Sequence, residues 1–141
     1  MESEKTSILI LDDEPIVGKR LQPSLERKGY EVEVFTAGSE AMARLAQRRF
    51  DIVITDLVME GMDGMQVLTA VKEQYPETEV IVITGYATME KVRETFNRGG
   101  FDFLAKPFKL GEIVEVIARA VAAQKSGCPH KFQGLMSADT D

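Results

Sequence analysis

The apolar residues of the chain gather in five short runs, which are separated by longer segments with a different spacing. The runs cover residues 8–11, 32–35, 52–55, 80–83 and 101–104. Three of them are almost unbroken and rich in valine and isoleucine. Runs of this kind are typical of strands that are covered on both faces, as in a parallel sheet. The pattern therefore predicts five buried strands.

The segments between the runs carry apolar residues three or four positions apart, which is the spacing of one helix face. The sets are Val17, Leu21 and Leu25; Met65, Leu68 and Val71; Met89, Val92 and Phe96; and Ile113, Ile117 and Val121. Strand and helix thus alternate five times along the chain. This alternation predicts an α/β fold with a doubly wound, five-stranded parallel sheet and helices on both faces.

Glycine and proline mark the helices further. Gly29 and residues 99–100 follow helical segments, where glycine is common. Pro23 lies inside the first helical segment. Because an interior proline removes a hydrogen bond, we expect a kink or a break there, compensated by the packing of Leu21 and Leu25.

Composition limits the classes of function. The 141 residues fit one domain, which we expect to span residues 1–124, with 125–141 as a flexible tail because that stretch lacks periodicity. The net charge of −6 argues against nonspecific nucleic-acid binding, so we expect no direct nucleic-acid contact. The polar start MESEKTS has no signal core, and no stretch approaches the roughly 20 apolar residues of a membrane helix. We therefore expect a cytoplasmic protein without membrane contact.

Polar side chains follow four of the five strands, at the edge where an α/β sheet usually binds ligands. They are Asp12, Asp13, Asp56, Thr84 and Lys106. In the flavodoxin-like strand order 2-1-3-4-5, these residues converge on one rim. Several carboxylates in one place repel unless a cation joins them, and oxygen ligands favour a hard ion such as Mg²⁺. Asp12 and Asp13 alone could also cap the helix that follows them.

Four motifs in order carry a resemblance to a known family. They are LDDEP at 11–15, DIVITDLVMEGMDG at 51–64, ITGYAT at 83–88 and FLAKPF at 103–108. Over about residues 6–124 the chain resembles a bacterial response-regulator receiver domain of two-component signalling. The stretches TGYAT and FDFLAKPF are most similar to the receivers of transcription activators.

The resemblance assigns a role to each residue of the rim. It implies that Asp56 accepts a phosphoryl group from a phosphohistidine on a sensor histidine kinase or a phosphotransfer protein. It also implies that Mg²⁺ is bound by the carboxylates of Asp13 and Asp56 and by the backbone carbonyl of Val58, with Asp12 acting through water. Lys106 pairs first with Asp56 and then with the phosphoryl group. Such a protein is not an enzyme beyond catalysing its own phosphorylation and dephosphorylation.

The resemblance also implies a switch, in which Thr84 and Phe103 reposition and change the surface formed by the fourth helix, the fifth strand and the fifth helix. That surface would control a partner or an output domain. The last helix, expected over 110–124, has a second apolar face, which we expect to form an interface with a second copy of the chain or with an output domain. The residues of this face are Val116, Ala120 and Ala123.

The sequence departs from the family pattern near Asp56. Glu60 stands where the family usually has proline, and it adds a negative charge near the site. Val58 and Tyr86 occupy positions that influence hydrolysis of the phosphoryl group. Because they are apolar or bulky, we predict slow hydrolysis. The lysine–proline bond at Lys106 is expected to be cis, as is usual in the family.

Two other functions fit the same fold. The first is a binding module that works without phosphorylation, which the complete set of acids and lysine disfavours. The second is a hydrolase that passes phosphate through an aspartate to water. Aspartyl phosphatases need a second acid two residues after the nucleophile, where this chain has Val58. Cys128 and His130 are too few for a metal site.

Overall fold

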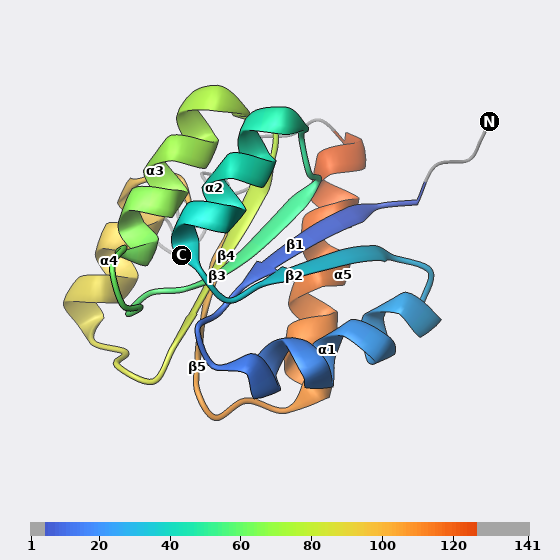
Figure 1. Ribbon diagram of the computed structural model, residues 1–141, viewed down its shortest axis with the longest axis horizontal. Coiled ribbons are helices and arrows are strands. Elements are labelled where there is room, and N and C mark those ends of the chain that lie inside the picture. Colours follow the sequence, from blue (N-terminus) through green and yellow to red (C-terminus); the bar gives the residue numbers. More distant parts are fainter. Residues whose placement is uncertain (1–4, 127–141) are drawn as a thin grey trace, which may run out of the picture.

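Five parallel strands form one sheet in the order β2-β1-β3-β4-β5 in the computed structural model, which describes residues 5–126 (Figure 1). The strands are β1 (Ser7–Leu11), β2 (Glu31–Phe35), β3 (Ile52–Asp56), β4 (Glu79–Thr84) and β5 (Asp102–Ala105). The five predicted strands and their order are confirmed. Each strand differs from its predicted bounds by at most one residue at either end.

Five helices cover the two faces of this sheet (Figure 1). They are α1 (Pro15–Arg27), α2 (Gly38–Gln47), α3 (Gly64–Gln74), α4 (Met89–Asn97) and α5 (Leu110–Ser126). Side chains of α1 and α5 pack in one core with Ile8 and Ile10, and side chains of α2 and α3 pack in the other with Leu9 and Leu11. Because successive strand residues face opposite sides, β1 is buried throughout, which explains its unbroken apolar run.

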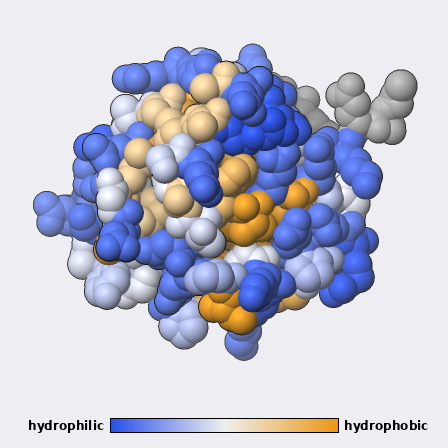
Figure 2. All heavy atoms as spheres, viewed as in Figure 1, coloured by the Kyte–Doolittle hydropathy of each residue, from blue (hydrophilic) through white to orange (hydrophobic). Residues whose placement is uncertain are grey.

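The edge strand β2 is partly open to solvent. Figure 2 shows hydrophobic side chains along β2 between α1 and α2, with hydrophilic side chains around them. Val34 and Phe35 of this strand are half-buried. This edge also carries a charged residue, Glu33. Its carboxylate accepts two hydrogen bonds from Arg44 of α2, at 2.8 and 2.9 Å. Charged groups on an edge strand discourage pairing with another chain.

Helix α1 continues through Pro23 from Pro15 to Arg27, so the expected break is absent. Leu21 and Leu25 are at most 1% exposed. An interior proline costs about 3 kcal/mol, whereas complete burial of one leucine contributes about 1.5–3 kcal/mol. The two buried leucines are therefore sufficient to offset the proline. The glycines expected at helix ends are confirmed, since Gly29 and Gly99 have φ values of 99° and 98°.

Two of the three residues of the proposed interface on α5 belong to the core, whereas the third, Ala123, is half-buried. Val116 is 5% exposed and Ala120 is 0% exposed, and both belong to the same core as Ile113 and Ile117. The apolar stripe of α5 is broad because this helix covers the sheet together with α1. Helix α5 also ends at Ser126, two residues beyond the expected bound. Cys128, His130 and the rest of the expected tail from residue 127 onward lie outside the described residues.

Within the described residues, every helix is too short or too polar to cross a bilayer.

Candidate functional site

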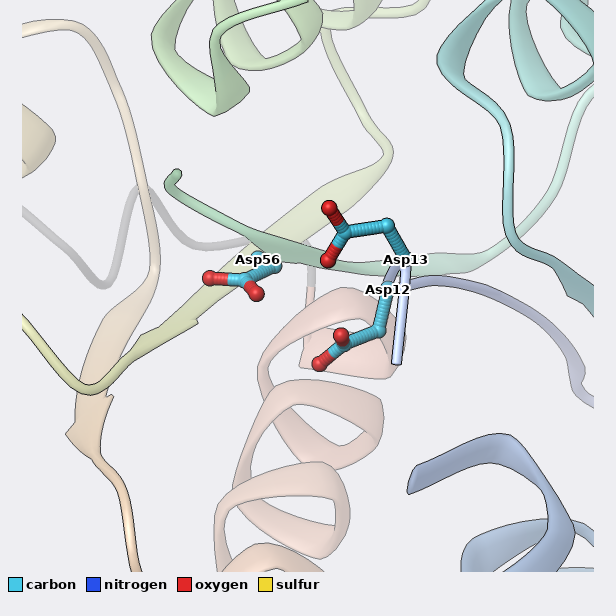
Figure 3. Close-up of side chains that lie close together, drawn as sticks. All are labelled: Asp12, Asp13 and Asp56. Carbon is cyan, nitrogen blue, oxygen red and sulfur yellow. The ribbon is translucent and has the colours of Figure 1, made fainter. Parts of the chain in front are cut away.

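Three aspartates meet at the carboxyl ends of β1 and β3. Asp12 and Asp13 follow β1 directly, and Asp56 is the last residue of β3. These strands are neighbours in the sheet. One carboxylate oxygen of each aspartate lies within 4.8 Å of those of the other two. Figure 3 shows the carboxylates of Asp12 and Asp13 extending toward the side on which Asp56 lies.

Asp12 is the most enclosed of the three, at 1% exposure. Its Oδ1 accepts a hydrogen bond from the Glu14 amide at 2.9 Å. Its Oδ2 lies 2.7 Å from Lys106 Nζ. This contact does not have the geometry of a hydrogen bond, and among the described residues the oxygen has no other partner. Burial raises the pKa of Asp12, opposed by Lys106 and the Glu14 amide, and the negative charge of Asp56 adds to the increase.

Lys106 follows β5 and is shared by three carboxylates. Its Nζ lies 2.7 Å from Asp12 Oδ2, 2.7 Å from Glu14 Oε1 and 3.1 Å from Asp56 Oδ2. Burial lowers the pKa of this ammonium, whereas the three contacts raise it by more. The pKa of Lys106 therefore lies above its ordinary value, and the group is charged at neutral pH. The hydrogen bond and charge of Lys106 in turn lower the pKa of Glu14.

Glu14 is a member of this site that the sequence interpretation did not single out. It was visible as the third acid of the LDDEP motif. Its partner Lys106 lies 92 positions away in the chain, however, and nothing in the local spacing indicates the contact.

The loop between β3 and α3 holds two of the aspartates through its backbone. The Val58 amide donates to Asp56 Oδ1 at 3.3 Å, and the Glu60 amide donates to Asp13 Oδ2 at 3.3 Å. The loop ends at Gly64, where an added Cβ would lie 2.2 Å from the backbone oxygen of Asp56. Only glycine allows the start of α3 to approach β3 this closely.

Thr84 and Phe103 lie on β4 and β5, the two strands that follow β3 in the sheet. Thr84 ends β4 and is fully buried, and its Oγ1 accepts a hydrogen bond from the Tyr86 amide at 3.0 Å. Gly85 and Tyr86, rather than Thr84, line the cleft above the acids. Phe103 lies on β5, half-buried against the core on the α3 side of the sheet.

A cleft of about 1000 Å³ opens above Asp56. It is lined by Asp13, Glu14, Val17, Arg20, Leu21, Asp56, Val58, Met59, Glu60, Gly85, Tyr86, Lys106, Pro107 and Phe108. The Lys106–Pro107 bond at its floor is cis, as expected. Four of the lining side chains are acids and two are bases, so the cleft attracts cations.

The acids fit a divalent cation. Their donor atoms are all carboxylate oxygens, which is the set preferred by Mg²⁺ and Ca²⁺. Among the described residues at this site, Lys106 supplies one positive charge against the three aspartates. An ion bound between their oxygens would offset the excess negative charge.

Comparison with known proteins identifies a family that this chain matches. The family model described as a response regulator receiver domain matches residues 8–118. The DNA-binding transcriptional regulator NtrC of Salmonella typhimurium is 30% identical over 115 residues, which is 82% of this chain and 24% of that protein. The chain thus spans about a quarter of the length of this curated relative.

Two solved structures are similar to the whole fold. One is a response regulator of Burkholderia pseudomallei with a phosphorylated aspartic acid, calcium ion and citrate. It has a TM-score of 0.75 and 25% identity, over 89% of this chain and 74% of that chain. The other is the beryllofluoride-activated NtrC4 receiver domain dimer. It has a TM-score of 0.80 and 28% identity, over 84% of this chain and 98% of that chain.

The similarity to NtrC bears on one earlier expectation. NtrC is named as a DNA-binding regulator, and the present chain covers only a quarter of it. The expectation of no direct nucleic-acid contact is therefore unsupported for a protein that contains this chain.

Proposed function

The chain belongs to the response regulator receiver domains of two-component systems, and from this premise we propose that Asp56 accepts a phosphoryl group from a phosphohistidine on a sensor histidine kinase or a phosphotransfer protein. The observation that carries the proposal is the contact of 3.1 Å between Lys106 Nζ and Asp56 Oδ2 at the floor of an acidic cleft. The phosphorylated aspartic acid in the Burkholderia pseudomallei structure supports it.

Mg²⁺ is the cofactor of this proposal. It would be held by the carboxylates of Asp13 and Asp56 and the backbone carbonyl of Val58, with Asp12 acting through water. When bound, Mg²⁺ neutralises charge on the phosphoryl oxygens and on the clustered acids. The oxygen cluster of the three aspartates supports this assignment. The calcium ion of the Burkholderia pseudomallei structure is also consistent with a divalent cation.

The chain's own residues do the rest of the chemistry. A carboxylate oxygen of Asp56 forms a bond to phosphorus while the bond from phosphorus to the imidazole nitrogen of the donor breaks. Lys106 then transfers its hydrogen bond from the Asp56 carboxylate to a phosphoryl oxygen. Because its raised pKa keeps it protonated, Lys106 supplies positive charge throughout. Dephosphorylation is a separate hydrolysis, in which a water oxygen forms a bond to phosphorus while the bond from phosphorus to the Asp56 oxygen breaks, so that phosphate leaves and the carboxylate is restored.

The conformational switch is proposed to begin at Thr84. Its hydroxyl, now paired with the Tyr86 amide, would turn to a phosphoryl oxygen and draw the loop after β4 toward Asp56. Helix α4 follows this loop and buries only Thr95 fully, so a shift of α4 disturbs few core contacts. Phe103 on the neighbouring strand would repack as α4 moves. The α4, β5 and α5 surface is thereby the proposed output.

A homodimer through α4, β5 and α5 remains part of the proposal, and the NtrC4 receiver dimer supports it. Because Val116 and Ala120 belong to the core, the contact would have to use the outer side of α5. Exposed residues of α5 include Glu115, Ala118 and Ala122.

Phosphorylation can be tested directly with a small phosphodonor. Wild type and Asp56→Asn should be incubated with labelled acetyl phosphate and Mg²⁺, and both incorporation and self-association followed. We expect wild type to be labelled and Asp56→Asn to remain unlabelled. Equal labelling of the two proteins would remove Asp56 from its role. If wild type is not labelled but binds a partner, the phosphorylation-independent binding module becomes the better description.

A further inference from the structure

Each of the three aspartates has one carboxylate oxygen held by a backbone amide. Asp12 Oδ1 accepts from Glu14, at 2.9 Å, and Asp56 Oδ1 accepts from Val58, at 3.3 Å. In both cases the donor lies two residues further along the chain. Asp13 differs, because its donor is the amide of Glu60, 47 positions away on the loop between β3 and α3.

The Asp13 carboxylate has fewer contacts that hold it in place than the carboxylates of Asp12 and Asp56 have. Asp12 and Asp56 each approach Lys106 with their Oδ2 atoms. Among residues 5–126, Asp13 has no such ion pair, and its side chain is exposed. The 3.3 Å bond to the Glu60 amide is therefore the restraint that the structure provides for the Asp13 carboxylate.

We propose that Glu60 is a positioning residue for cation binding: its backbone N–H fixes Oδ2 of Asp13 and leaves the other oxygen turned to the shared space of the three acids. This inference rests on the proposed divalent-ion site. Groups that hydrogen-bond a metal ligand orient it, and their loss typically weakens metal binding by about 10–100-fold. Glu60 acts through Asp13 and does not itself bind the ion.

The side chain of Glu60 has a separate, smaller effect. It is exposed, lines the same cleft, and within the described part of the chain has no ion pair with a lysine or arginine. Its negative charge increases the attraction of the cleft for cations, but solvent and salt screen exposed charges over about 8–10 Å. The amide and the carboxylate of this one residue can thus be separated by substitution.

Three variants at this position separate the two effects. Glu60→Pro removes both the amide hydrogen and the charge, whereas Glu60→Gln and Glu60→Ala remove the charge and keep the amide. Mg²⁺ affinity should be measured by calorimetry on the unphosphorylated full chain, with Glu73→Gln as a control for an exposed acid on α3. We expect Glu60→Pro to weaken binding by about tenfold or more. Glu60→Gln and Glu60→Ala should weaken it by less than about threefold, an effect that fades at high salt.

A second measurement covers the outcome in which Glu60→Pro does not fold. In the ion-free protein, the amide proton of Glu60 should move upfield in the NMR spectrum when Asp13 is replaced by alanine, more than the amides of Met59 and Gly61 do. An unchanged Glu60 amide overturns the inference.

The outcomes separate this inference from the proposed function. Mg²⁺ binding in wild type with equal affinity in Glu60→Pro overturns the role of Glu60 and leaves the ion site intact. Equal losses in all three Glu60 variants assign the effect to charge and also overturn it. No Mg²⁺ binding by wild type, in contrast, overturns the ion site itself and the role of Glu60 with it.

Discussion

Lys106 and Glu14, which both line the acidic cleft, form an ion pair of 2.7 Å that joins the residue after β5 to the residue before α1. The same ammonium also contacts Asp56, at 3.1 Å. Glu14 therefore competes with the proposed phosphoacceptor for Lys106, the only lysine among residues 5–126 that lines the cleft.

Replacing Glu14 by glutamine should release Lys106 toward Asp56. Because Glu14 is exposed, its hold on the lysine is weak, and we expect the rate of labelling by acetyl phosphate to rise by a factor of about two to five. Rates should be compared at equal Mg²⁺ with Glu112→Gln, an exposed acid on α5, as the control. A lower rate in Glu14→Gln would show that Glu14 orients Lys106 rather than competing for it.

Asp12→Asn should stabilise the ion-free protein at neutral pH. Burial raises the pKa of Asp12, so the folded state binds this proton more tightly than the unfolded state does. The ionised carboxylate therefore opposes folding above the folded-state pKa, and this penalty fades as the pH falls below it. We expect a Tm about 2–4 °C higher than wild type at pH 7, with the difference shrinking on acidification. Thermal unfolding in the presence of a chelator, at pH 7 and at lower pH, measures the Tm difference and its change with pH. A Tm of Asp12→Asn below that of wild type at pH 7 would contradict the argument.

Mg²⁺ should stabilise the wild-type protein because it binds only the folded arrangement of the aspartates. At an ion concentration about 100 times the Kd, the gain is about 2.7 kcal/mol. Asp13→Asn and Asp56→Asn should lose most of this gain. Denaturant unfolding with MgCl₂, against NaCl of the same ionic strength, tests the prediction. Equal gains in the two salts would indicate screening rather than binding.

The phosphorylated protein should lose its label slowly. Val58 and Tyr86 are 48% and 68% exposed and line the cleft that contains Asp56. We expect their bulk to hinder the attacking water. We expect Val58→Asn or Tyr86→Ala to speed loss of label by about tenfold, which corresponds to about 1.4 kcal/mol in the barrier. The half-life of the labelled protein after removal of the donor is the measurement. Loss of the label from the wild-type protein within seconds would contradict slow hydrolysis.

The Glu33–Arg44 pair should contribute stability that is lost in acid. The hydrogen bond from Arg44 lowers the pKa of Glu33 in the folded state. The contribution is thus present above the ordinary glutamate pKa and disappears as the pH falls through the lower, folded-state value. We expect Arg44→Gln to lower the Tm by about 1–3 °C at pH 7 and by less below pH 3. A deficit that persists at low pH would indicate lost packing instead.

The sequence indicates the fold and the three aspartates well because both follow from short patterns. Apolar runs indicate the strands, and in a parallel sheet any polar residue just after a strand lies at the ligand-binding edge. Contacts between distant positions are a different matter. The pairing of Glu14 with Lys106 and the bond from the Glu60 amide to Asp13 cross 92 and 47 positions, and a backbone donor has no sequence signature.

Two differences from the expected structure have a common physical origin. Of the kink or break expected at Pro23, the break is absent, and Val116 and Ala120, which were expected on a free surface, belong to the core. In both cases local rules were outweighed by packing against the sheet, since burial of the surrounding apolar side chains contributes more than the local preference costs.

The close approach of Gly64 to Asp56 fixes the position of the loop between β3 and α3. A methyl group at residue 64 would meet the Asp56 backbone oxygen and the Leu57 Cα, at 2.2 and 2.8 Å. This steric clash would move the start of α3 away from β3 and displace the loop between them. The hydrogen bonds from the Val58 and Glu60 amides to Asp56 and Asp13 would then both be lost. Because Gly64 has no side chain, the start of α3 can stay close to β3, and the Val58 and Glu60 amides both remain within hydrogen-bond distance of their aspartates.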